Sequence, residues 1–325
     1  MKQLEISDYR KVNESYHRRL IYHAGIDCGF FVELNYMINA MLYCLANGYR
    51  FLLYSEDANF GTGKGWTEYF LPFCEEVHEP FHHKYNLRRQ SIWRRILAHW
   101  LAFKTYGEYV RLSQDVAHEP DKFYHIPALG ISCSYTEAYA MLARIIWQPQ
   151  PEVQQKMKDA RHRLSLPEIY SGVQIWEGNN ATGSRLISGW QIIQALHPQD
   201  GECIFALADN YQQLEIVRNE FQKLRIVSLC QPHETGYHHQ AFEHLSPQEK
   251  KESIIRLLIS VDILLQCCAF VGTITSGPSV FLLKVRADDP CVTAIDCPQD
   301  MLPDCLTLNI DERAAISRRF VVRLT

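Results

Sequence analysis

Polar side chains follow three predicted strands in the second half of the chain. The first strand ends in the stretch YSGVQIWEGNNATGSR (170–185), where Glu177 is the only carboxylate and Arg185 the only base. The second strand ends at Asp209 and Asn210. The third strand leads through FVGTITSGPSV (270–280) into a helix, and this loop contains Thr273, Thr275, Ser276 and Ser279.

These residue types suit a nucleotide-sugar. Hydroxyl groups, a flexible Gly277 and a helix N-terminus together favour a phosphate or pyrophosphate. A carboxylate at the end of a neighbouring strand, here Asp209, suits a ribose hydroxyl or a guanine edge. Each loop alone could equally be an ordinary surface loop, and the interpretation depends on their occurring at successive strand ends.

Strands and helices alternate regularly from residue 170 onward. Such alternation predicts an α/β fold with a parallel, doubly wound sheet covered on both faces. A ligand then binds at the carboxyl ends of the strands. The predicted strands are 172–175, 202–209, 225–229, 268–273 and 291–296, and the predicted helices are 186–196, 210–224, 246–267 and 278–287. Ser246 and Glu249 form a predicted capping box, and Gly189 is expected to interrupt its helix.

The first half shows the same alternation less clearly. Residues 23–31 are rich in turn formers, 32–48 have helical spacing with Gly48 as terminator, and 49–55 form a short buried strand. The basic segment 85–110 is amphipathic and contains Arg88, Arg89, Arg94 and Arg95. It is either a solvated helix face or a platform for an anionic or sugar-containing acceptor. The motif QPQP (148–151) predicts a helix break or a hinge between domains.

Length, charge and composition indicate a two-domain protein that neither binds nucleic acid nor spans a membrane. A chain of 325 residues is long enough for two domains, which we expect at 1–165 on the acceptor side and 166–325 on the nucleotide-sugar side. A net charge of −4 gives no basic field for nucleic acid. The N-terminus does not resemble a signal peptide, and no run of about 18 apolar residues predicts a membrane span. Eleven Cys without C-x-x-C spacing indicate free thiols and a cytoplasmic protein.

Two segments resemble the α1,6-fucosyltransferases, the family of the N-glycan core and nodulation-factor enzymes. They are HAGIDCGFF…LPF, with its turn, long helix, strand and Gly-Trp turn, and SIIRLLISVDILLQCCAFVGTITSGPSVFLLKVR. The resemblance covers roughly residues 22–75 and 170–295. It implies two Rossmann-like domains facing across a cleft (GT-B-like), a GDP-fucose donor, inversion at the anomeric carbon and no metal or other cofactor.

The resemblance also implies roles for individual residues. Gly29 and Phe30 would lie near the donor pyrophosphate and Asp209 near the guanosine. The residues that would meet the β-phosphate are Thr275, Ser276 and Ser279. The implied partners are a nucleotide-sugar donor and a glycan or glycolipid acceptor, without nucleic acid; peripheral association with a membrane is left open, and so is the oligomeric state.

The loop after residue 173 departs from the family pattern. Gln174 stands where the family has a His, and Trp176 and Glu177 replace a pair of Arg. Asn179 and Asn180 replace Asp-Lys, and neither Trp nor Glu can form the bidentate bonds that Arg gives a pyrophosphate. Two interpretations compete. In the first, the chain is a working transferase in which Arg185 or a residue from the first half supplies the positive charge and Glu177 is the base. In the second, the chain is an inactive nucleotide- or glycan-binding protein of the same fold.

Other chemistry has weaker support. The adjacent pairs His82–His83 and His238–His239 could bind zinc, although neighbouring His residues rarely reach one metal, and we interpret them as surface or hydrogen-bonded histidines. GTGKG (61–65) falls short of a phosphate-binding P-loop. No local arrangement singles out a Cys–His nucleophile.

Overall fold

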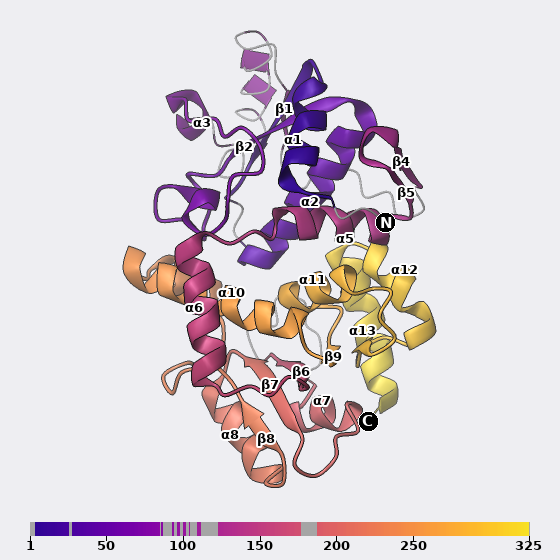
Figure 1. Cartoon of the computed structure of the whole chain (residues 1–325). Coiled ribbons are helices and arrows are strands. Elements are labelled where there is room, and N and C mark those ends of the chain that lie inside the picture. Colours follow the sequence, from indigo (N-terminus) through magenta and orange to yellow (C-terminus); the bar gives the residue numbers. More distant parts are fainter. Residues whose placement is uncertain are drawn as a thin grey trace. The chain divides into compact units, whose positions relative to one another are not determined.

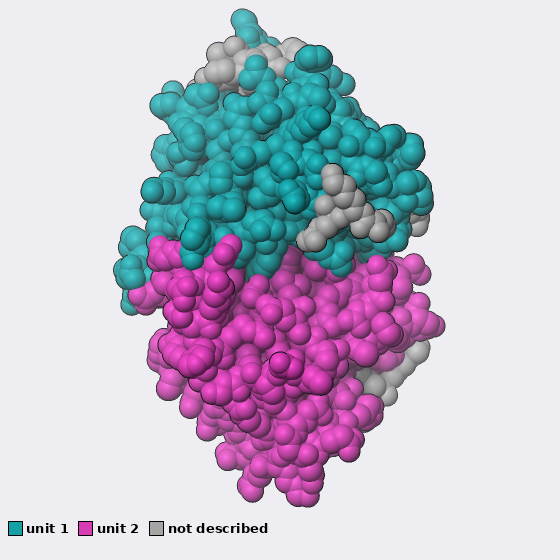
Figure 2. Space-filling view, viewed as in Figure 1, with its two compact units in different colours: residues 1–151, 246–251 teal, residues 152–245, 252–325 magenta. Residues whose placement is uncertain are grey.

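The computed structural model describes residues 4–25, 28–84, 86, 109–111, 123–176 and 187–324, together with positions 93, 96, 97, 100, 101 and 104. The chain divides into two compact units (Figure 2). Unit 1 comprises residues 1–151 and 246–251, and unit 2 comprises 152–245 and 252–325.

The units divide at the predicted helix break. Helix α5 (Tyr135–Ile146) ends before QPQP, and helix α6 (Pro151–Arg163) begins at its last proline. The predicted boundary at 165/166 between an acceptor-side and a nucleotide-sugar-side domain stays a prediction, and α6 lies between residue 151 and that position. Arg161 of α6 donates hydrogen bonds to the Tyr170 hydroxyl (3.1 Å) and to Gln266 Oε1 (2.9 Å), which ties this helix to unit 2.

Unit 1 contains a parallel sheet in the order β2-β1-β3 and a separate antiparallel pair, β4 and β5 (Figure 1). In the register of this sheet, Leu20 pairs with Phe51 on one side and Tyr109 on the other. The remaining elements of the unit are α1 (Ile6–Ser15), β1 (Arg18–His23), α2 (Phe30–Asn47), β2 (Tyr49–Tyr54), η1 (Gly65–Glu68), α3 (Pro80–Lys84), β3 (Tyr109–Arg111), β4 (Tyr124–Ile126), η4 (Pro127–Leu129) and β5 (Ile131–Cys133).

The central helix and strand of unit 1 agree with the sequence prediction. Gly48 ends α2 in the left-handed region at φ 67°, which glycine adopts without steric cost, and β2 follows at once. Helix α1 and strand β1 were not predicted. The strand begins with the exposed pair Arg18 and Arg19, so the buried run of four residues that follows is too short to be recognised as a strand in the sequence.

Unit 2 contains a five-stranded parallel sheet in the order β10-β9-β6-β7-β8. Strands β7 and β8 follow β6 on one side of the sheet, and β9 and β10 follow it on the other side. The elements are β6 (Ser171–Ile175), α7 (Gly189–Ala195), β7 (Cys203–Ala208), α8 (Tyr211–Glu220), β8 (Arg225–Val227), α9 (His239–Glu243), α10 (Pro247–Leu265), β9 (Ala269–Gly272), α11 (Gly277–Val285), β10 (Val292–Ala294), η5 (Gln299–Met301), α12 (Leu302–Thr307) and α13 (Ile310–Leu324). The first residues of α10, up to residue 251, belong to unit 1.

This strand order is that of a Rossmann fold, and it confirms the predicted parallel α/β sheet. The direction of winding reverses between β6 and β9, where Val173 pairs with Val271. Such a switch point opens a crevice at the carboxyl ends of the two strands. The predicted cleft between the two halves of the chain stays a prediction.

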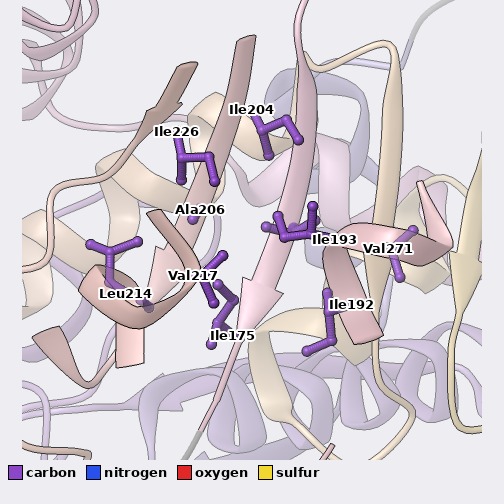
Figure 3. Packing of buried hydrophobic residues seen from close by; sticks show 11 residues of the cluster. Ile175, Ile192, Ile193, Ile204, Ala206, Leu214, Val217, Ile226 and Val271 are labelled. Carbon is purple, nitrogen blue, oxygen red and sulfur yellow. The ribbon is translucent and has the colours of Figure 1, made fainter. Parts of the chain in front are cut away.

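Apolar side chains from the sheet and its helices form one core in unit 2 (Figure 3). Val173 and Ile175 of β6 pack with side chains of β7, α7 and α8, and all are nearly fully buried. Gly189 does not interrupt α7, as the sequence suggested, but is its first residue, after the N-cap Ser188. A Cβ on Gly189 would lie 2.5 Å from Val217 Cγ2, so the close approach of α7 to the core requires glycine.

Candidate nucleotide site at the switch point of unit 2

A buried polar side chain marks the switch point. Gln174 is the fourth residue of β6, a strand buried along its whole length, and only 4% of its surface is exposed. Its Nε2 donates to Ser276 Oγ (2.6 Å), and its Oε1 accepts from Ser279 Oγ. A buried amide is costly unless both its ends are hydrogen-bonded, and here both are.

These hydrogen bonds tie β6 to the loop after β9. Ser276 is the N-cap of α11, but its hydroxyl is engaged by Gln174 and caps no backbone N–H of the helix. Ser279, in the first turn, accepts a hydrogen bond from the Thr273 N–H (3.2 Å) while it donates to Gln174. Side chains from β6 and from the start of α11 therefore fix the shape of the loop.

Two residues from the C-terminal part of the chain hold the same loop. Asp296, which follows β10 and is fully buried, accepts the Ile274 N–H at 2.8 Å. Arg313 of α13 donates its Nε to the Ile274 carbonyl at 2.9 Å. Burial raises the pKa of Asp296, and the Ile274 N–H and the hydroxyls of Ser317 and Thr275 oppose that rise.

Gly272 allows this loop to lie against β9. A Cβ at this position would lie 2.3 Å from Ser279 Oγ and 2.8 Å from the Phe270 ring. The glycine therefore makes room for the serine that Gln174 binds.

Asp209 lies at the end of β7, the strand next to β6 on the other side. It is half-buried, and its Oδ2 accepts the Tyr237 N–H at 3.0 Å. Its carbonyl accepts the Gly236 N–H at 2.9 Å, so the residue also orders the loop at 234–237. Burial, with the nearby carboxylates of Glu234 and Asp209, raises the pKa of Cys230 to about 12, which keeps this thiol protonated at neutral pH.

The structure thus brings some predicted site residues together. Gln174, Thr275, Ser276 and Ser279 meet at the switch point, and Thr275 is half-buried with its hydroxyl 3.5 Å from that of Thr273. Trp176 is also half-buried, directly after β6. Glu177 and Arg185, the predicted catalytic pair, lie outside the described residues.

Gly29 and Phe30 belong to unit 1. Gly29 is the N-cap of α2, and the Phe30 side chain is 4% exposed and packs against Phe31, Phe60 and Phe70. The Phe30 ring therefore belongs to an aromatic cluster of unit 1, and the predicted position of Gly29 and Phe30 near the donor pyrophosphate stays a prediction. The buried Glu33 accepts the Gly25 N–H at 2.9 Å and the Tyr22 hydroxyl at 2.6 Å, which anchors the start of the turn before α2.

Three of the four paired histidines lie within hydrogen-bond distance of protein groups. His82 is buried and lies 3.1 Å from His23 between ring nitrogens, while the exposed His83 contacts Asp57 at 2.9 Å. His239 Nδ1 lies 3.1 Å from the Tyr237 hydroxyl. Within the described residues no cluster of three or more His, Cys, Asp or Glu side chains could hold a metal. The expectation of a metal-free reaction stays a prediction.

No protein-family model matches the chain, and no curated protein matches it. Solved structures do. NodZ α1,6-fucosyltransferase soaked with GDP-fucose has a TM-score of 0.53 at 11% identity, over 82% of this chain and 92% of that one. NodZ from Bradyrhizobium has a TM-score of 0.51 at 14% identity, over 86% and 95%. A mutant of Arabidopsis thaliana FUT1 in complex with GDP has a TM-score of 0.51 at 11% identity, over 86% and 73%.

The chain is similar in fold to these solved fucosyltransferase structures. At these identities the likeness concerns the fold alone, so the site must be judged on its own residues. Sequence reasoning missed Asp296 and Arg313. The signal for Asp296 was available, because CVTAID places a carboxylate directly after an apolar strand, as FALAD does for Asp209. Nothing in the sequence near Arg313 points to Ile274.

Proposed function

We propose that the chain is a glycosyltransferase that binds a GDP-sugar at the switch point of unit 2 and transfers fucose, or a related sugar, with inversion to a glycan or glycolipid acceptor. The observation that carries this proposal is the Gln174–Ser276–Ser279 network, because it shapes a loop and a helix start at the crevice of a Rossmann sheet. The fold shared with NodZ and FUT1 supports the same donor class.

The donor would be bound by backbone and side chains of two strand ends. The backbone N–H groups at the start of α11 and the hydroxyl of Thr275 suit the β-phosphate. Ser276 and Ser279 hold that loop in place through their hydrogen bonds to Gln174. Asp209, at the end of the second strand of the sheet, suits a ribose hydroxyl or the guanine edge.

Transfer breaks the bond between the anomeric carbon and the β-phosphate oxygen, and the acceptor hydroxyl oxygen forms the new bond to that carbon. The bonding electrons leave with GDP, and the acceptor proton passes to a base. Arg185 is our candidate for stabilising the growing negative charge on GDP, and Glu177 is our candidate base.

A specific substitution favours a second candidate function, an inactive protein that binds a nucleotide or a glycan. Trp176 occupies a position directly after β6 where the resembled enzymes have Arg, and an indole cannot neutralise a pyrophosphate. In this alternative the crevice keeps the nucleotide without cleaving the donor.

Release of GDP from GDP-fucose distinguishes the two functions. With a mixed glycan pool as acceptor, we expect the wild type to release GDP. Arg185→Ala should lower kcat roughly a hundredfold or more while GDP affinity changes little, because the charge develops in the transition state. Glu177→Gln should act similarly, and the exposed Arg163→Ala serves as control.

The opposite pattern would establish the binding protein. In that case the wild type releases no GDP. The double variant Trp176→Arg/Glu177→Arg then binds GDP more tightly by about 1–3 kcal/mol, because it restores charge-assisted hydrogen bonds to the pyrophosphate.

A further inference from the structure

Unit 1 exposes large apolar side chains at helical spacing. The described residues between 93 and 104 are helical, and Trp93, Ile96, Leu97 and Trp100 are 80%, 55%, 48% and 55% exposed. The spacing i, i+3, i+4, i+7 puts these four on one side of a helix, and we call them the apolar stripe. Single exposed apolar residues are common, but a contiguous stripe with two Trp marks an interaction surface.

The segment around the stripe is strongly basic. Between Glu79 and Glu108 the sequence has no Asp or Glu, whereas the whole chain has a net charge of −4. The cations in this interval are Lys84, Arg88, Arg89, Arg94, Arg95 and Lys104. The structure describes Lys104, whose ammonium lies 4.8 Å from the ring centroid of Trp100.

We propose that the apolar stripe, with Lys104 beside Trp100, binds the surface of an anionic lipid bilayer. A helix with exposed Trp in a basic stretch of sequence lies in the plane of the interface, where the indole rings sit at the level of the headgroups. Apolar burial and attraction to anionic lipid then act together, and two such signals are needed for stable anchoring.

Other observations agree with a surface anchor. Of the helices described, none is long and apolar enough to cross a membrane. A second copy of the chain is a poorer occupant for the stripe, because pairing two copies would bring two basic segments together in low dielectric. The proposal does not depend on the transferase activity, since it concerns only unit 1.

Vesicle co-sedimentation of the full chain tests the proposal. We expect the chain to bind vesicles that contain phosphatidylserine. Its affinity for vesicles of pure phosphatidylcholine should be lower by roughly tenfold or more, and high salt should abolish binding to the anionic vesicles. Trp93→Ser/Trp100→Ser should reduce binding to the anionic vesicles roughly tenfold or more. The matched control is Ile169→Ser, which removes a side chain that is 77% exposed in unit 2.

Each other outcome overturns the proposal. Equal binding to both vesicle types would show that charge has no role. Unchanged binding of the double Trp variant would show that the apolar stripe has none. Absence of binding to any vesicle would exclude the lipid surface. A dimer in solution that the double Trp variant converts to monomer would assign the stripe to a second copy instead. Unchanged circular dichroism of the variants checks that they fold.

Discussion

Gln174 is the residue that holds the candidate site together. Its amide joins the end of β6 to the N-cap and first turn of α11, and all three side chains are at most 4% exposed. A polar residue in a fully buried strand is unexpected for packing alone. We infer that it fixes the loop at the switch point.

Substitution of Gln174 by Leu should therefore destabilise the protein. The hydroxyls of Ser276 and Ser279 would stay buried and lose a partner each, at a cost of about 1–3 kcal/mol in the free energy of unfolding. Urea denaturation measures this loss. Gln212→Leu, on the exposed side of α8, is the control, and equal midpoints for the two variants would contradict the structural role of Gln174.

At the scale of elements, α7 approaches the sheet closely because it begins with Gly189. Ala at this position would place its Cβ 2.5 Å from Val217 Cγ2 and 3.3 Å from Ile175 Cγ2. Overpacking of this kind costs about 1–3 kcal/mol.

A substitution at Val217, the other residue of this contact, tests whether the close approach of α7 depends on Gly189. Gly189→Ala and Val217→Ala should each lower the free energy of unfolding, but the double variant should lose clearly less than the sum, because the smaller side chain makes room for the new Cβ. A double-mutant cycle by urea denaturation measures the coupling. Strict additivity would show that α7 moves away from the core at little cost.

Elements with a strong local signal were predictable from the sequence. The strands predicted at 172–175 and 202–209 correspond to β6 and β7, Gly48 ends its helix, and the Ser246–Glu249 capping box is present. Strand β1 was missed because two Arg precede its short buried run. Helices α12 and α13 were not predicted either.

The site was only partly predictable for a different reason. Ser276 and Ser279 stood out by residue type, but their partner Gln174 lies about a hundred residues earlier in the chain. Asp296 and Arg313 act on Ile274 through its backbone groups, which leave no trace in the sequence of that loop. Contacts of this kind depend on the strand order, and no local pattern encodes it.

At the scale of the whole molecule, the two units differ in the features that suggest a function. Unit 2 has the Rossmann sheet and the polar switch point, whereas unit 1 has the exposed apolar stripe in a basic segment. A fold shared at 11–14% identity leaves room for a site that differs in its charged residues. The replacement of the Arg pair of the resembled enzymes by Trp176 and Glu177 is such a difference, and it determines which chemistry must be tested.

Hydrogen–deuterium exchange with and without GDP tests the central claim most directly, because it asks both whether the nucleotide binds and where. A bound ligand slows exchange by stabilising the segments that contact it. We predict that GDP protects the backbone amides of 272–280 and 209–211, and that UDP and ADP at the same concentration protect them far less. Binding of GDP that protects only segments elsewhere in the chain, or equal protection by all three nucleotides, would contradict a guanine nucleotide site at the switch point of unit 2.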